Sequence, residues 1–149
     1  MKRRRTTAPI KRPSERVSYV GSTSVATNSS QVFYVFAATA AGTLTSMTLS
    51  LTNGTSSSSE DGTYCLVYVP EGYNANTVRD WSTPGTFYEP EEQVLLAGII
   101  PSTGGPTGPW KSKTSRKVRN GDRIALILTN NEADSAMLSR FLFQASYIQ

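Results

Sequence analysis

The sequence predicts an all-β fold, a single antiparallel sandwich of eight strands that follows a basic N-terminal arm. Glycine, proline, serine and threonine are frequent among β-branched and aromatic residues, which is typical of many short strands and turns. Hydrophobic alternation and turn residues divide the chain from Val17 onward into eight strand-like segments. With 149 residues and 38% hydrophobic content, the chain suits one domain with a substantial core.

The first four segments are separated by turn or loop residues and span residues 17–27, 31–38, 44–52 and 63–69. The first alternates so that Val17 and Tyr19 share a face. The second is a continuous apolar run, typical of a strand covered on both faces. The third alternates between apolar and hydroxyl side chains, which predicts one buried and one hydroxyl-rich face. The fourth is apolar and stops at Pro70.

The last four segments span residues 93–100, 111–118, 122–129 and 137–148. Segment 111–118 is polar on both faces, which predicts an edge or interface strand. After it, Asn120-Gly121 predicts a tight turn in which Gly121 is left-handed and Asp122 caps the turn. Irregular residues 73–92 predict a functional loop that contacts a partner. The glycine- and proline-rich residues 101–109 predict a surface loop.

Eight such strands favour a jelly roll, in which two four-stranded sheets pack in Greek-key order. An immunoglobulin-like sandwich is the alternative, because strand number alone does not determine topology. We therefore expect a single eight-stranded antiparallel jelly-roll sandwich with a disordered or extended basic N-terminal arm. The expected division is residues 1–16 for the arm and residues 17–149 for the jelly-roll domain.

Positive charge is concentrated in this arm. The net charge of +4 divides into +6 for the first 17 residues, with seven basic and one acidic, and −2 for the remainder. The arm has little aliphatic surface to offset the entropy of ordering. A flexible polycation binds phosphates through counterion release, so nucleic acid is the expected partner. The alternatives are a nuclear-import signal, a contact with an anionic membrane and a solubilising tail.

Catalysis is not expected, because the chain has no histidine and a single cysteine. Histidine is the usual general base and the commonest metal ligand. Cys65 lies in an apolar run and is expected to be a small buried hydrophobe. Glu89, Glu91 and Glu92 are clustered, but Pro90 and the loop setting favour solvated or intersubunit charge over a calcium site or an acid/base pair. We predict no catalytic residue, no cofactor and no metal site.

Membrane insertion and secretion are not expected either. No stretch approaches the roughly 20 apolar residues of a membrane-spanning helix. The basic start leads into threonine, proline and lysine instead of a hydrophobic signal core.

Three stretches carry a family resemblance. They are Lys2-Arg3-Arg4-Arg5 with Lys11-Arg12, the segment Tyr88-Glu89-Pro90-Glu91-Glu92-Gln93-Val94-Leu95 that leads into a strand, and the hairpin Lys113-Thr114-Ser115-Arg116-Lys117-Val118-Arg119-Asn120-Gly121-Asp122-Arg123-Ile124. In organisation they resemble the small jelly-roll capsid proteins of circular, replication-protein-encoding single-stranded DNA viruses, the circovirus-like group. The short, basic-armed coat proteins of plant satellite viruses are the nearest alternative.

The resemblance implies a coat protein that assembles into an icosahedral shell of about 60 copies and packages single-stranded nucleic acid. It implies a place in the virion, with the host nucleus visited during assembly. The implied partners are further copies of the chain, the viral genome, a host nuclear-import receptor and a host-cell surface receptor. A nonviral β-sandwich binding module with a basic, nucleic-acid-binding tail is the alternative function.

Charge counting predicts that the arm does not bind such a genome alone. About 60 arms at +6 supply on the order of 360 positive charges, whereas a genome carries one negative charge per nucleotide. Basic residues of segment 111–118 and the turn after it are therefore expected to help. The residues predicted to bind nucleic acid are Lys2, Arg3, Arg4, Arg5, Lys11, Arg12, Arg16, Lys111, Lys113, Arg116, Lys117 and Arg119. Trp81 and Trp110 are interpreted as interface or core residues rather than as platforms for bases.

Overall fold

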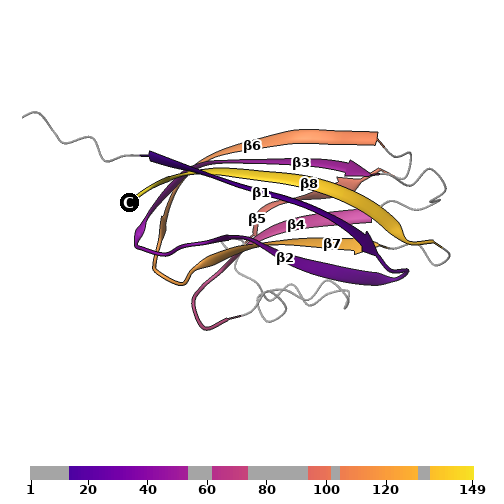
Figure 1. The fold of residues 1–149 in the computed structure, drawn as a ribbon, viewed down its shortest axis with the longest axis horizontal. Coiled ribbons are helices and arrows are strands. Elements are labelled where there is room, and N and C mark those ends of the chain that lie inside the picture. Colours follow the sequence, from indigo (N-terminus) through magenta and orange to yellow (C-terminus); the bar gives the residue numbers. More distant parts are fainter. Residues whose placement is uncertain (1–13, 54–61, 74–93, 102–104, 131–134) are drawn as a thin grey trace, which may run out of the picture.

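The computed structural model describes residues 14–53, 62–73, 94–101, 105–130 and 135–149, and the regular structure in them is all β. The eight strands are β1 (Ser14–Val25), β2 (Ser29–Ala37), β3 (Gly42–Asn53), β4 (Gly62–Val69), β5 (Val94–Ile100), β6 (Gly105–Val118), β7 (Arg123–Asn130) and β8 (Met137–Ile148). They form two stacked antiparallel sheets, with strand orders β1-β8-β3-β6 and β2-β7-β4-β5 (Figure 1).

The pairing of the strands identifies the topology. The first strand pairs with the eighth, the second with the seventh, the third with the sixth and the fourth with the fifth. This nested pairing is the Greek-key arrangement of a jelly roll. The predicted jelly-roll sandwich is therefore confirmed, and the immunoglobulin-like alternative is not adopted.

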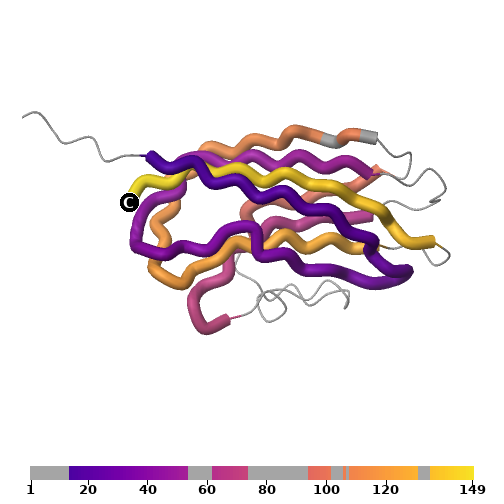
Figure 2. The backbone as a smooth tube through the Cα atoms, in the orientation of Figure 1, coloured from indigo at the N-terminus to yellow at the C-terminus, as the bar shows by residue number. Residues whose placement is uncertain are grey.

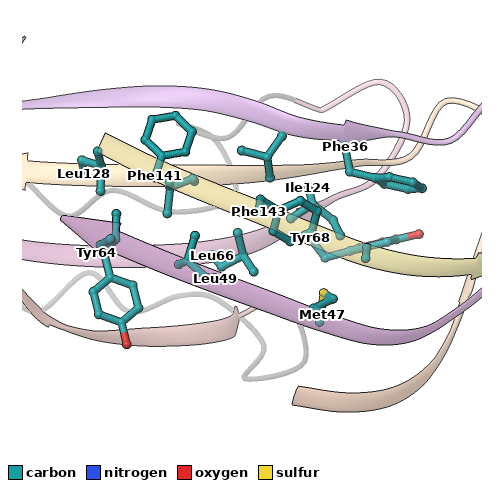
Figure 3. Packing of buried hydrophobic residues seen from close by; sticks show 14 of the residues in the cluster. Phe36, Met47, Leu49, Tyr64, Leu66, Tyr68, Ile124, Leu128, Phe141 and Phe143 are labelled. Carbon is teal, nitrogen blue, oxygen red and sulfur yellow. The ribbon is translucent and has the colours of Figure 1, made fainter. Parts of the chain in front are cut away.

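The main core fills the space between the two sheets. Strand alternation directs every second side chain inward, so Leu49 and Phe143 from one sheet join one cluster with Leu66 and Ile124 from the other (Figure 3). Each of these side chains is almost fully buried. Burial of one such side chain stabilises the fold by roughly 1.5–3 kcal/mol.

A second apolar cluster lies on the opposite face of the β2-β7-β4-β5 sheet. Cys65 and Val67 of β4 and Ala125 and Ile127 of β7 alternate with the residues of the main core and are also buried. The two central strands of this sheet are therefore apolar on both faces, as continuous hydrophobic runs indicate. The prediction that Cys65 is a small buried hydrophobe is confirmed.

The predicted boundaries differ from the structure by more than two residues at two strand starts. β1 begins at Ser14 because Ser14 already lies opposite Ile148, the last residue of β8 (Figure 2). Arg16, counted above with the arm, is thus a strand residue. β6 begins at Gly105, so the second half of the expected surface loop 101–109 belongs to a strand. This strand lies at a sheet edge, where prolines are tolerated because one side of the ladder is unpaired.

The expectation that the second strand is covered on both faces is wrong for part of its length. The ring of Tyr34 is 38% exposed, whereas Val35 and Phe36 are both buried. The physical reason is a bulge between Tyr34 and Phe36, which places two consecutive residues against the core. In addition, β2 is an edge strand of its sheet, so it has a neighbouring strand, β7, on one side only.

Gly21 is expected to be intolerant of substitution. A Cβ at this position would clash with Cζ of Phe141, whose ring covers the glycine across the β1–β8 pair. Gly21→Val should therefore lower the free energy of unfolding by about 1–3 kcal/mol through overpacking. Urea denaturation measures this, with the outward-facing neighbour substitution Ser22→Ala as the matched control. Equal stability of the two variants would contradict the close packing.

Candidate nucleic-acid interface

Four of the predicted basic residues lie on one face of the molecule. Across the β1-β8-β3-β6 sheet, Lys113 lies opposite Ser46, Ser46 opposite Ser146, and Ser146 opposite Arg16. Directly opposed residues of antiparallel strands point to the same side of a sheet. Since Arg16 and Lys113 are exposed, this row of residues lies on the outer face.

Lys111 and Lys117 extend this surface along the edge strand β6. Lys111 lies opposite Thr48 and Lys117 opposite Thr43, and both lysines are exposed. We call the outward face that carries Arg16, Lys111, Lys113 and Lys117 the basic sheet face. Because neighbouring strands are about 4.8 Å apart, Arg16 lies roughly 14 Å across the sheet from Lys113.

Hydroxyl side chains are frequent over the whole outer face of this sheet. Register and alternation place on it Ser14, Ser18, Ser22, Ser24, Thr43, Ser46, Thr48, Ser50, Thr52 and Ser146. The predicted hydroxyl-rich face of the third segment is thus confirmed and continues into β1 and β8. Arg16 donates a hydrogen bond of 3.1 Å to Oε1 of Gln144 on the same face. Hydroxyl and guanidinium groups can all donate hydrogen bonds to phosphate oxygens.

Negative charge is located elsewhere in the described part of the chain. Its acidic residues are Glu15, Glu71 and Asp122. Glu15 lies opposite Tyr147, whose ring belongs to the inner face of the sheet. Glu71 and Asp122 lie beyond the ends of β4 and β6, where the Asp122 carboxylate accepts a hydrogen bond from the backbone amide of Glu71. Among the described residues, the basic sheet face therefore carries no carboxylate.

Arg116 and Arg119 lie outside the basic sheet face. Arg116 is opposite the inward-facing Leu44, and its guanidinium lies 4.0 Å from the centroid of the Tyr68 ring. Such a stacked arginine stabilises packing through a cation–π interaction. Arg119 is exposed in the turn that follows β6. The structure therefore separates these two arginines from Lys111, Lys113 and Lys117, although the five are close in sequence.

Asp122 anchors the hairpin that ends the basic strand. Its carboxylate is 4% exposed and accepts hydrogen bonds from the Arg119 amide at 2.8 Å, from the Glu71 amide at 3.0 Å and from the hydroxyl of Tyr68. Gly121, at φ +92°, adopts the left-handed conformation that the turn requires. The predicted turn and its Asp122 cap are thus confirmed, and the cap also ties β6 and β7 to the end of β4.

The Asp122 contacts shift two pKa values in a consistent way. Burial acts to raise the pKa of the Asp122 carboxyl, but the hydrogen bonds from Tyr68, Arg119 and Glu71 together with the Arg119 charge lower it below its ordinary value. Burial raises the pKa of the Tyr68 hydroxyl, and the bond to Asp122 raises it further. Tyr68 therefore remains a protonated donor and Asp122 an ionised acceptor at neutral pH.

Several predicted residues fall outside the described part of the chain. These are Lys2, Arg3, Arg4, Arg5, Lys11 and Arg12 of the arm, Trp81, and the acidic residues Glu89, Glu91 and Glu92. Trp110 is described, and its ring packs against the core with its centroid 4.3 Å from that of Tyr64. It therefore belongs to the core rather than to a surface for bases.

Arg140 on β8 was missed in the sequence. It lies opposite Ser22 on one side and Thr52 on the other, so it shares the outer face of the sheet with the four basic residues above. The alternation of segment 137–148 already places Arg140 away from Phe141 and Phe143. This signal could have identified it as an outward cation, but not its neighbours on β1 and β3.

Among the described residues, no three histidine, cysteine, aspartate or glutamate side chains come together as metal ligands would. The same residues include no helix long and apolar enough to cross a membrane.

No protein-family model and no curated protein matches the chain. Two solved structures resemble it over nearly the whole length. A chain from Bacillus endospore appendages, which form disulfide-linked pili, is 12% identical, with 99% of this chain and 98% of that chain covered and a TM-score of 0.45. A chain of the cyanophage Pam1 capsid asymmetric unit is 19% identical, with coverages of 98% and 94% and a TM-score of 0.46. At this level of likeness, neither neighbour assigns a function.

Proposed function

We propose that the chain is a viral coat protein that assembles into a small icosahedral shell, and that its arm and its basic sheet face together bind a single-stranded genome. The main support for nucleic-acid binding is the arrangement of charge on the basic sheet face. Arg16 and Lys113 are far apart in sequence, yet they lie in one row across the sheet on a surface free of described carboxylates. The jelly-roll fold supports the shell, since it is an architecture of viral capsid domains.

The position of the arm supports a shared role with this surface. The arm joins the sheet at Ser14, which lies opposite Ile148, and Ile148 lies opposite Thr43 beside Lys117. The chain thus enters the sandwich at the same end of the sheet as Arg16 and Lys117. A strand held by the arm would meet the basic sheet face within about 15 Å, three strand spacings.

The positive charge that the arm and the basic sheet face supply together supports this shared role. In a shell of about 60 copies, arms at +6 provide on the order of 360 positive charges. Lys111, Lys113 and Lys117 raise this number to about 540, since Arg16 is already counted with the arm. Lysine, arginine and hydroxyl groups contact phosphate without reading bases, so the proposed binding is independent of sequence. A place in the virion follows from this proposal, and the basic clusters of the arm suit a host nuclear-import receptor as well.

Deletion of residues 1–13 tests the role of the arm without touching β1, which begins at Ser14. Most of the nucleic acid that copurifies with the full chain should be lost, because six of its basic residues are removed. The ratio of absorbance at 260 and 280 nm measures the bound nucleic acid, and circular dichroism checks that the sandwich stays folded. An unchanged nucleic-acid content would contradict the role of the arm. Digestion of the bound material with DNase and, separately, RNase identifies the genome type.

A further inference from the structure

A cavity of about 640 Å³ opens on the outer face of the β1-β8-β3-β6 sheet. Its lining includes Ser22, Ser24, Thr52, Leu138, Ser139 and Arg140. These residues lie toward the end of the sheet farthest from Ser14 and Lys117, roughly 13 Å along β3 from the row of Lys111. A cavity of this volume is in the range of binding sites for small ligands.

Arg140 gives the cavity a positive charge. Its guanidinium has five N–H donors and no acceptor, and it carries its charge at every relevant pH. The side chain is exposed, and none of the described residues that line the cavity is acidic. The charge is therefore available to an anion from outside the chain.

Hydroxyl groups surround this charge. Ser22 and Thr52 lie directly opposite Arg140 on the two neighbouring strands, so all three point to the same side of the sheet. Ser24 and Leu138 form the next row along the sheet. One cation with several short hydroxyl donors is a donor set that fits the oxygens of a phosphate.

Ser139 also lines the cavity, but its hydroxyl is not one of the donors. Strand alternation places its side chain on the inner face with Met137 and Phe141, opposite Thr23 and Asn53, where it is 3% exposed. The donors on the outer face are therefore Arg140, Ser22 and Thr52.

We infer that the cavity is a phosphate-binding pocket, with Arg140 as its cation and Ser22 and Thr52 as hydroxyl donors. The inference rests on the proposed function in that the phosphate would belong to a packaged strand. A free nucleotide or inorganic phosphate offers the same chemistry. Half-exposed Leu138 leaves apolar surface beside the phosphate for a sugar or a base.

Salt-dependent binding of a fluorescent ten-nucleotide oligo(dT) to the full chain tests the nucleic-acid source. Loss of one phosphate contact in Arg140→Gln should reduce the slope of log K against log salt by about 0.7. Arg140→Lys should retain most of the slope. Arg123→Gln, which removes a charge over the ring of Tyr34 on the other sheet, is the matched control and should leave the slope unchanged. A slope in Arg140→Gln equal to that of the wild type would overturn the assignment to nucleic acid.

Thermal unfolding in inorganic phosphate and in chloride of equal ionic strength tests the pocket itself. The wild type should be stabilised more by phosphate than by chloride, and Arg140→Gln should lose that difference. If the wild type binds the oligonucleotide but Arg140→Gln changes neither readout, the pocket is wrong and the proposed function stands. If the wild type binds no oligonucleotide, the proposed function fails, whereas an effect of phosphate that depends on Arg140 would still support the pocket with a free phosphate as its ligand.

Discussion

Replacement of Lys111, Lys113 and Lys117 together by glutamine is expected to weaken the binding of single-stranded oligonucleotides about 100-fold in 0.1 M salt. Each lost phosphate contact reduces the slope of log K against log salt by about 0.7, so three contacts reduce it by about 2. All three side chains are exposed on the edge strand β6, and each lies opposite a serine or threonine of β3. Their removal should therefore leave the core and the stability of the fold nearly unchanged.

Two variants make this result specific. The triple replacement of the same lysines by arginine keeps the charge and should keep the slope. Arg116→Gln removes a charge from the same strand, but that arginine stacks on the ring of Tyr68 and is not part of the basic sheet face. It should change the slope by much less than the lysine replacements do. A triple glutamine variant with wild-type affinity at every salt concentration would show that this face does not bind nucleic acid.

Replacement of Asp122 by alanine is expected to lower the free energy of unfolding by about 3 kcal/mol. The substitution leaves three donors without their acceptor, namely the Tyr68 hydroxyl and the amides of Arg119 and Glu71. Hydrogen bonds to a charged group contribute about 1.5–3 kcal/mol, and unpaired buried donors add their desolvation cost. Denaturant unfolding followed by tryptophan fluorescence measures the change. Tyr68→Phe removes only one of these bonds and should cost about 1 kcal/mol.

The Asp122 contribution should also depend on pH. Because the folded protein lowers the pKa of this carboxyl below its ordinary value of 3.8, the ionised form is the one that the fold stabilises. The contribution is fully present above the unfolded pKa and is lost as the pH falls through the folded pKa. The stability difference between the wild type and Asp122→Asn should therefore be constant near neutral pH and shrink in acid. A difference that grows as the pH falls would contradict the direction of the shift.

Strand positions could be predicted closely from the sequence, because period-two alternation and turn residues are local signals. The range 137–148 coincides with β8, and the edge position of segment 111–118 follows from its polar character on both faces. The errors fall where pairing with a distant strand overrides the local signal. Ser14 belongs to β1 because it pairs with Ile148. Gly105 belongs to β6 because it pairs with Asn53, although the residues around Gly105 are typical of a loop.

The candidate site was less predictable, since it depends on how four strands are ordered and aligned. Lys113 and Arg116 belong to one short basic segment, but they are three residues apart, so strand alternation directs them to different sides of the sheet. Arg140 stands alone in an apolar segment and joins Ser22 and Thr52 only through the β1-β8-β3 order. Charge composition thus predicts a class of partner, whereas the face proposed to bind it follows only from the register of the strands.

Electron microscopy of the purified full chain, with light scattering on the same sample, tests whether the chain forms a shell. We expect closed particles of uniform size that contain nucleic acid, formed from many copies of one 16.2 kDa chain. The arm and the basic sheet face should then both contact the packaged strand inside the shell. A stable monomer at high protein concentration and modest salt would contradict the shell and favour a β-sandwich binding module with a basic tail.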